Sequence, residues 1–202
     1  MSAAYSIPAA PVTVSSDIKR SEFITCIAHT PGREAVMAFI QSCREAHPKA
    51  NHHCYAFIAG APYDDTSHGS SDDGEPAGSA GRPMLNVLSH SGIGEITVVV
   101  IRYFGGIKLG VGGLVRAYSQ STQDGLKELL LQQFTPRFPL WLRCDYSTHA
   151  QLLRRLPEWD AKVEQEHFAV DITLCMAVPS ALRDQACQSL LQLGCQLCDP
   201  PA

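Results

Sequence analysis

The chain has 202 residues, and 45% of them are hydrophobic. This is enough for one or two packed domains and excludes an extended or disordered protein. Sixteen Lys and Arg residues stand against twenty Asp and Glu residues, giving a formal net charge of -4. The chain as a whole therefore lacks the positive excess of a nonspecific polyanion binder, and any contact with nucleic acid must come from a local patch.

Neither a membrane nor an export route is indicated. The longest apolar run, at 96–101, is far shorter than the roughly 20 residues that cross a bilayer, and the N-terminus carries no signal-like pattern. Eight scattered cysteines lie mostly in apolar segments, as expected for reduced thiols. Cys195 and Cys198 have no matching second pair for a zinc site. We expect a cytoplasmic monomer without cofactor, metal or membrane contact.

Strand-like and helix-like segments alternate over the first two thirds of the chain. Thr30 is the expected N-cap of the first helix, with Pro31 in its first turn. The polar stretch at 60–74, rich in Gly, Ser and Asp, predicts a flexible loop that orders on binding. The predicted strands are 11–17, 22–29, 52–59 and 96–101, and the predicted helices are 33–46, 76–91 and 114–131. The strand at 96–101 is almost uniformly apolar, which is typical of a central strand covered on both faces.

Residues 133–138 break this pattern, so we predict domains at 1–134 and 135–202. Ser147 and Ser180 are the expected caps of two short helices, and alternate residues from 168 to 178 are apolar, as on one face of a strand. The predicted elements of the second domain are strands at 138–144, 162–165, 168–178 and 195–198 and helices at 147–156 and 180–193. The order β-α-β-β-α-β is the ferredoxin-like arrangement, and the fold class is α+β.

Two blocks stand out for function. Residues 71–83 form an acidic segment rich in Gly and Pro, and residues 102–118 form a glycine-rich turn that carries Arg and Lys. Both blocks are poor material for a core and good material for a binding surface made by loops. The candidate binding residues are Asp72, Asp73, Glu75, Arg82, Arg102, Tyr103, Gly105, Gly106, Lys108, Gly110, Gly112, Gly113 and Arg116.

The chemistry of the acidic block has two interpretations. Its three carboxylates are hard oxygen donors suited to Mg²⁺ or Ca²⁺, although the run does not follow the EF-hand pattern. The same carboxylates precede Pro76 and would complement the positive end of the helix that follows, and this is the role we favour. The two roles are compatible.

The glycine-rich turn lies between a buried strand and a helix N-terminus, where backbone N–H groups favour an anion. Neither a P-loop nor a complete dinucleotide fingerprint is present, which argues against an NTPase or a dehydrogenase. With Arg102, Lys108 and Arg116 nearby, a nucleic-acid backbone or an acidic protein partner fits better. Tyr103, Phe104 and Tyr118 either stack on exposed bases or belong to the core, and core packing is the commoner role.

His52 and His53 are neighbours on a predicted strand, so only one of them can face a site. A lone histidine is more often structural than a catalytic base. No set of nucleophile, base and orienting residue can be assembled from the sequence spacing, so catalytic residues are not predicted.

Together the blocks Ser-Asp-Asp-Gly-Glu-Pro-Ala-Gly-Ser-Ala-Gly-Arg-Pro (71–83) and Arg-Tyr-Phe-Gly-Gly-Ile-Lys-Leu-Gly-Val-Gly-Gly-Leu-Val-Arg-Ala-Tyr (102–118) closely resemble the signature of the IMPACT family, whose bacterial branch is usually called YigZ. The resemblance covers essentially the whole chain. It implies an N-terminal domain similar to domain 2 of a small-subunit ribosomal protein, a fold also seen in elongation factor G. It also implies a C-terminal ferredoxin-like domain resembling domain V of that factor. Eukaryotic relatives look like translation regulators.

Two functions remain open. The first is a noncatalytic, translation-associated regulatory protein whose Gly/Arg/Lys surface contacts RNA, the ribosome or a ribosome-bound translation factor, and this is the function we favour. The second is a Mg²⁺-dependent enzyme acting on a phosphorylated or nucleic-acid substrate. In that enzyme Asp72, Asp73 and Glu75 would hold the ion, while Lys108 and Arg116 neutralise phosphate charge.

Overall fold

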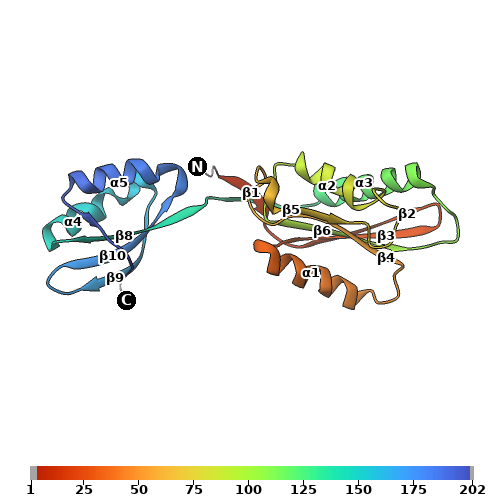
Figure 1. The fold of residues 1–202 in the computed structure, drawn as a ribbon, viewed down its shortest axis with the longest axis horizontal. Helices are drawn as coiled ribbons and strands as arrows, with labels where there is room; N and C mark the ends of the chain where they lie inside the picture. The colour runs from red at the N-terminus through yellow and green to blue at the C-terminus, as the bar shows by residue number, and fades with distance from the viewer. Residues whose placement is uncertain (1–3, 201–202) are drawn as a thin grey trace. The chain divides into compact units, whose positions relative to one another are not determined.

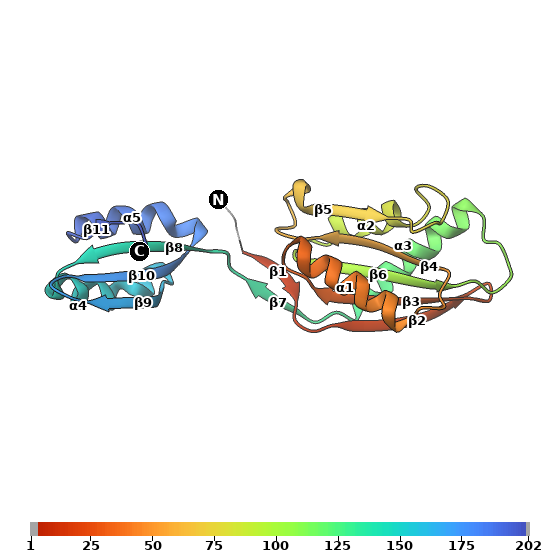
Figure 2. The ribbon, with the colours of Figure 1, turned by 60° about the horizontal axis from the view of Figure 1, so that its bottom comes forward.

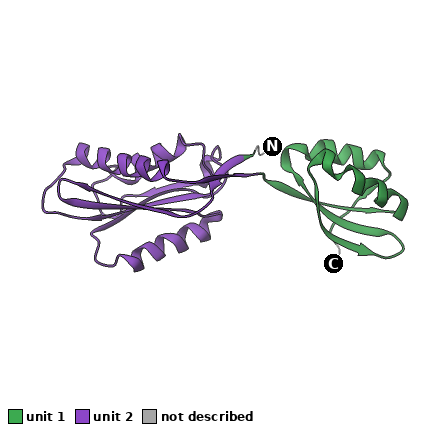
Figure 3. Ribbon diagram, turned by 180° about the vertical axis from the view of Figure 1, so that it is seen from behind, with its two compact units in different colours: residues 1–4, 135–202 green, residues 5–134 purple. Residues whose placement is uncertain are grey.

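A computed structural model describes residues 4–200 of the chain, which divides into two compact units (Figure 3). One unit comprises residues 5–134, and the other is built from residue 135 onward. Both units combine sheet and helix, so the fold class is α+β. No helix among the described residues combines the length and the apolar character needed to span a bilayer.

A five-stranded antiparallel sheet is the framework of residues 5–134 (Figures 1 and 2). Its strand order is β2-β3-β6-β4-β5. These strands are β2 Val12–Ile18, β3 Ser21–His29, β4 His52–Ile58, β5 His68–Ser71 and β6 Ile96–Tyr103. The central strand β6 is buried along nearly its whole length, which confirms the prediction that 96–101 is covered on both faces.

Three helices cover the two faces of this sheet. Helix α1, Gly32–Ala46, packs on one face, and α2, Gly81–Ser89, and α3, Val111–Lys127, pack on the other (Figure 1). Because strand side chains alternate, Val98 and Val100 belong to the core under α2 and α3, whereas Val99 and Ile101 belong to the core under α1.

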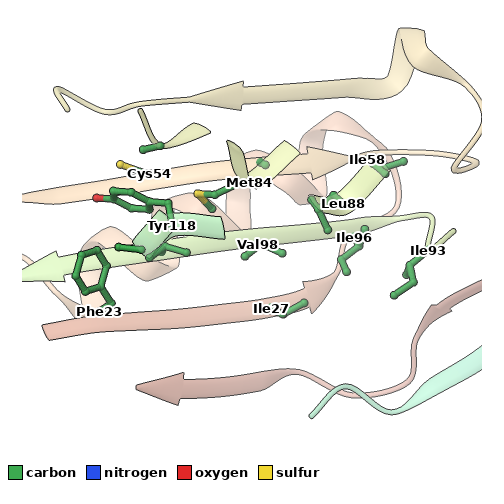
Figure 4. Packing of buried hydrophobic residues seen from close by; sticks show 14 of the residues in the cluster. Phe23, Ile27, Cys54, Ile58, Met84, Leu88, Ile93, Ile96, Val98 and Tyr118 are labelled. Carbon is green, nitrogen blue, oxygen red and sulfur yellow. The ribbon is translucent and has the colours of Figure 1, made fainter. Parts of the chain in front are cut away.

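Large side chains fill the core under α2 and α3 (Figure 4). Phe23 of β3 and Tyr118 of α3 meet edge to face, with ring centroids 5.4 Å apart, and both are fully buried. Gly125 lets α3 approach β3, since a Cβ at this position would lie 2.8 Å from the Ile27 side chain. The helix therefore depends on a glycine that its propensity alone would disfavour.

Several local predictions for this unit are wrong. Pro31, rather than Thr30, is the N-cap of α1, because the Thr30 hydroxyl lies 2.7 Å from the Thr97 hydroxyl and bonds across the sheet. The stretch at 60–74, predicted as a flexible loop, contains a 3-10 turn at Asp65–Ser67 and the edge strand β5. Helix α2 begins at Gly81, and not at 76.

The sequence pattern also did not predict a two-stranded ribbon in this unit. The predicted helix 114–131 ends at Lys127, and the following strand β7, Leu131–Phe134, pairs antiparallel with β1, Tyr5–Pro8. The apolar pattern misled because Leu129 is buried although it lies beyond the helix.

The second unit has the predicted element order β-α-β-β-α-β, with sheet order β11-β8-β10-β9. Short 3-10 turns lie at Leu156–Trp159 and Ser180–Leu182. The main elements are β8 Arg137–Cys144, α4 Tyr146–Arg155, β9 Lys162–Phe168, β10 Ile172–Pro179, α5 Arg183–Gln192 and β11 Gln196–Leu197.

Three predictions for this unit are wrong in detail. The two strands expected at 162–165 and 168–178 are present, but the turn between them was misplaced: the chain turns between Phe168 and Ile172 and leaves Val170 94% exposed. Helix α4 is capped by Asp145, whose carboxylate accepts from the backbone N–H of Thr148, and not by Ser147. The predicted cap of the last helix, Ser180, begins a 3-10 turn, and no side chain caps α5.

Candidate nucleic-acid interface

Asp72 accepts hydrogen bonds from the backbone at the start of α2. Its Oδ1 accepts hydrogen bonds from the backbone N–H groups of Ala80 (3.0 Å) and Gly81 (2.8 Å), and its Oδ2 accepts one from Gly78 (2.8 Å). Burial by itself would raise the pKa of Asp72, but these three donors outweigh burial and hold the pKa below its ordinary value. The carboxylate therefore completes the helix N-terminus, the capping role expected from the sequence.

Asp73 joins β4 to α1. Its Oδ2 accepts from the backbone N–H of His53 at 2.7 Å, and its Oδ1 accepts from Arg44 Nη2 at 2.8 Å. The residue adopts a positive φ of 43°, and Gly74 follows at 88°, so the chain reverses sharply here. This turn directs Asp73 away from the next carboxylate in the block.

Glu75 is buried in an ion pair with Arg102. Its Oε1 accepts from Arg102 Nη1 at 2.7 Å and from the Tyr118 hydroxyl at 2.8 Å, and the side chains of Glu75 and Arg102 are only 4% and 6% exposed. Burial, followed by the neighbouring Cys54 and Glu75, raises the pKa of Tyr118, which stays a hydrogen-bond donor. Tyr118 is thus a core residue, as we favoured, and it does not stack on an outside ligand.

Arg102 makes further contacts inside the protein. Its Nη2 donates to the Ser21 hydroxyl at 3.2 Å, and its guanidinium carbon lies 5.4 Å from the ring centroids of both Phe23 and Phe104. Such contacts hold the guanidinium in one orientation. Arg102 therefore positions the site from within, while the exposed cations face solvent.

The three carboxylates of the acidic block each serve a different partner. Asp72 bonds to backbone N–H groups, Asp73 to Arg44 and β4, and Glu75 to Arg102 and Tyr118. They do not converge on a common point. Over residues 4–200, no group of three or more His, Cys, Asp and Glu side chains has an arrangement suited to a metal ion.

Tyr103 and the two histidines are divided between the faces of the sheet. Tyr103 packs with the core under α1, and its hydroxyl lies 3.0 Å from Nδ1 of His47. His52 turns towards Glu75, with Nε2 4.0 Å from Oε2, whereas His53 contacts the His47 carbonyl at 3.2 Å. Tyr103 therefore lies on the face opposite to the one that carries the Arg102 guanidinium.

The loop between β6 and α3 is fixed at its beginning. The backbone N–H of Phe104 donates to Asn51 Oδ1 at 2.8 Å, and that of Gly105 donates to the Ser21 hydroxyl at 3.3 Å. Helix α3 then starts after Gly110, which has a φ of 72° and offers no side-chain cap. The first N–H groups of α3 consequently have no acceptor within the helix.

The glycines of this loop differ in their tolerance of a side chain. A Cβ at Gly105 would overlap the backbone carbonyl of Arg20, whereas a Cβ at Gly112 would meet open space. We expect Gly105→Ala to lower the free energy of unfolding by about 1–3 kcal/mol because the two loops must separate. Gly112→Ala, the matched control, should leave the free energy of unfolding unchanged or raise it, since Ala is favoured over Gly in helices by about 1 kcal/mol. Urea unfolding followed by circular dichroism measures both, and equal stability of the two variants would contradict the close contact.

Exposed cations gather around the start of α3. Lys108 and Arg116 are exposed on the loop and the helix, and Arg82 is exposed in the first turn of α2. Lys19 and Arg20, which were not predicted as site residues, form the tight β2–β3 turn with positive φ values of 47° and 66° and are also exposed. We call Lys19, Arg20, Lys108 and Arg116 the cationic end of this unit; Arg82 lies next to β5 at the start of α2 and lines neither of the cavities described next.

Two neighbouring cavities open at the cationic end. One, of about 510 Å³, is lined by Lys19, Leu109 and Arg116, among others. The other, of about 360 Å³, is lined by Glu75, Arg102, Phe104, Lys108, Leu109 and Val111, among others. Because Leu109 lines both, the cavities adjoin. The two basic residues at a two-residue hairpin turn were the sequence signal that could have identified the missing part of this surface.

Comparison with known proteins supports the grouping of both sequence blocks in one domain. The Impact N-terminal domain family matches residues 19–126. This chain is 50% identical over 175 residues to the IMPACT family member YigZ of Escherichia coli strain K12, covering 87% of this chain and 86% of that protein. An IMPACT family member of Haemophilus influenzae is 42% identical over 176 residues, covering 87% and 85%.

A crystal structure of a hypothetical protein has the same fold over both units. It is 44% identical in sequence and matches with a TM-score of 0.74, covering 100% of this chain and 99% of that one. The domain match, the identities to whole relatives and the two sequence blocks agree. The chain belongs to the IMPACT family, in its YigZ branch.

Proposed function

We propose that the protein is a noncatalytic, translation-associated regulatory protein that contacts the RNA of the ribosome through its cationic end. The observation that carries this proposal is that exposed Lys and Arg side chains gather at one end of the unit formed by residues 5–134, although the chain has a formal net charge of -4. The carboxylate in the wall of the smaller cavity, Glu75, is buried and neutralised by Arg102, and the exposed Asp17 and Glu22 pair with each other across β2 and β3 beside the Lys19-Arg20 turn. A local positive surface of this kind binds phosphate backbones without a basic protein overall.

The start of α3 supports the same function. Its uncapped N–H groups carry the positive end of the helix dipole, and they lie beside Lys108 and Gly110 at the smaller cavity. Such helix ends are common phosphate contacts in nucleic-acid interfaces. Gly105 lets the loop lie close to the β2–β3 turn, and Gly106, with a φ of 86°, has open space at its Cβ position, whereas Gly113 packs against the Leu109 side chain.

The fold of the second unit supports a more specific proposal, that each unit resembles a domain of the translation machinery. Its β-α-β-β-α-β order and its sheet order β11-β8-β10-β9 match a ferredoxin-like domain of the kind found as domain V of elongation factor G. We place the first unit with domain 2 of the small-subunit ribosomal protein. These two assignments favour a partner on the ribosome, although fold alone does not determine function.

A Mg²⁺-dependent enzyme fits the geometry less well. That mechanism needs Asp72, Asp73 and Glu75 to face one ion. Instead, each carboxylate is bound by protein donors that would have to be displaced: three N–H groups at Asp72, Arg44 at Asp73 and Arg102 at Glu75.

Sedimentation of a cell lysate through sucrose gradients tests the proposal. The protein should comigrate with a ribosomal subunit at low salt and leave it at high salt. Lys108→Ala and Arg116→Ala should each weaken this association, and each should reduce the salt slope of binding by about 1. Lys127→Ala is the matched control, because this exposed lysine lies at the opposite end of α3 and should leave association unchanged.

The result that would contradict the proposal is a protein that stays at the top of the gradient at every salt concentration. Comigration that is equally strong in Lys108→Ala, Arg116→Ala and the control would show that the cationic end is not the contact.

A further inference from the structure

The smaller cavity at the cationic end has mixed walls. Leu109, Val111 and Leu114 supply apolar surface, while Glu75 and Arg102 supply buried polar groups. Its volume of about 360 Å³ lies at the lower end of the roughly 300–1,000 Å³ typical of small-molecule sites. The cavity is therefore the size for one compact group and not for an extended ligand.

An aromatic ring at this cavity is held ready for stacking. Phe104 lines the cavity, and its side chain is 44% exposed. Its backbone is fixed by Asn51, and the Arg102 guanidinium lies against the ring at 5.4 Å. A ring supported in this way is a preorganised platform for a planar group.

The same cavity holds an unused donor. Arg102 is 5% exposed, and its Nε–H has no hydrogen-bond partner among the residues that the structure describes, although both terminal nitrogens are bonded. A buried donor without an acceptor is costly unless a ligand or water supplies one. Arg102 thus contributes a buried polar group to the wall of the cavity.

Glu75 adds acceptor capacity beside that donor. Both hydrogen bonds that described side chains donate to Glu75 end on Oε1. Its Oε2 has His52 Nε2 at 4.0 Å, which is too long for a hydrogen bond. A donor and an acceptor therefore stand together on the polar side of the cavity.

An anion site adjoins these groups. Gly110, the N-cap of α3, and Val111, its first residue, line the cavity, and the helix is 17 residues long with no side-chain cap. The exposed Lys108 lines it as well. N–H groups at a helix start together with a lysine favour a phosphate.

From these groups we propose that the cavity binds one unpaired nucleotide of RNA, with the base stacked on Phe104 and its phosphate at the start of α3. This inference rests on the proposed function and names the ligand feature that the site selects. A simple anion would leave Phe104 and the apolar walls unused, and an apolar side chain of a protein would leave Glu75 Oε2 and Lys108 without a partner in the cavity. A nucleotide uses all of them, since it joins a planar base with a polar edge to a phosphate.

Fluorescence anisotropy with two RNA probes tests this inference on the full chain. The first probe is an unstructured single strand about 10 nucleotides long, and the second is the same strand annealed to its complement. We expect tighter binding of the single strand. Phe104→Ala should weaken single-strand binding by about 5- to 150-fold, the range that stacking of one base supplies, with little change for the duplex.

Two further variants make the result specific. Ile107→Ala, the matched control, removes a 40% exposed apolar side chain of the same loop that does not line the cavity, and it should bind as the wild type does. Phe104→Trp should retain binding, and its indole fluorescence should be quenched by the single strand.

Each outcome decides a separate question. Equal binding of both probes, with Phe104→Ala unchanged but Lys108→Ala and Arg116→Ala weakened, would overturn the nucleotide cavity and leave the proposed function standing. Comigration with ribosomes without binding of either probe would overturn the cavity in favour of a protein contact. Failure of both assays would overturn the cavity and the proposed function together.

Discussion

Replacing Arg102 by Ala is expected to lower the free energy of unfolding of residues 5–134 by about 3–5 kcal/mol, because Glu75 would remain as a buried charge without its partner. Both side chains are almost fully buried, and the pair also holds the Tyr118 hydroxyl and the Ser21 hydroxyl. Loss of the guanidinium would further remove the support behind Phe104. Arg102→Ala should therefore lower both the free energy of unfolding and the affinity of the cationic end for RNA.

Urea unfolding can measure this effect within one molecule. Both tryptophans, Trp141 and Trp159, lie in the second unit, so their fluorescence reports that unit and serves as an internal reference. Circular dichroism reports both units. We expect Arg102→Ala to shift the dichroism transition of the first unit to lower urea while the tryptophan transition stays in place.

A double variant separates the charge from the packing. Glu75→Gln combined with Arg102→Met removes both charges and keeps the volume, so it should lose less stability than Arg102→Ala alone. If the single and double variants were equally destabilised, the loss would come from packing, and the account of the ion pair would be wrong.

Asp72→Ala is expected to lower the free energy of unfolding by about 2 kcal/mol, because three backbone N–H groups at the start of α2 lose their acceptor. Asp72→Asn is the control: it keeps one acceptor oxygen and should lose less. Urea unfolding of both variants at neutral pH gives the comparison. Equal stability of Asp72→Ala and the wild type would mean that the carboxylate does not hold the helix.

The same carboxylate gives a pH dependence with a definite sign. The pKa of Asp72 is lowered in the folded protein, so its stabilising effect is present above the ordinary aspartate pKa and is lost as the pH falls through the folded value. The stability difference between the wild type and Asp72→Ala should therefore be full at neutral pH and shrink in acid. A difference that grows as the pH falls would contradict this.

Elements with strong local patterns could be predicted from the sequence. The helix at 32–46 has apolar residues at helical spacing, and the strand at 96–103 contains a nearly continuous apolar run, so the type and position of both could be predicted. The ribbon of β1 and β7 could not be found, because it joins segments more than 120 residues apart, as in the pairing of Tyr5 with Phe134. The turn between Phe168 and Ile172 was hidden because apolar residues alternate straight through it.

The position of the candidate site could be predicted from the sequence, but the separate role of each of its residues could not. The glycine and charge pattern marked both blocks as a loop surface. It could not show that Arg102 turns inward to Glu75, since that pairing depends on which face of β6 each residue occupies. The same alternation sends Tyr103 to the α1 side. Lys19 and Arg20 join the surface because their turn lies against Gly105 and because Lys19 lines the larger cavity with Arg116.

Ultraviolet crosslinking of the protein to RNA in cells, followed by mass spectrometry of the attached peptides, tests the central claim most directly. Photocrosslinking reports only side chains in direct contact with a base. We expect nucleotides attached within residues 102–116, at Phe104 above all, and the signal should be weaker in Lys108→Ala. Crosslinks confined to other parts of the chain, or none at all, would contradict an RNA contact at the cationic end.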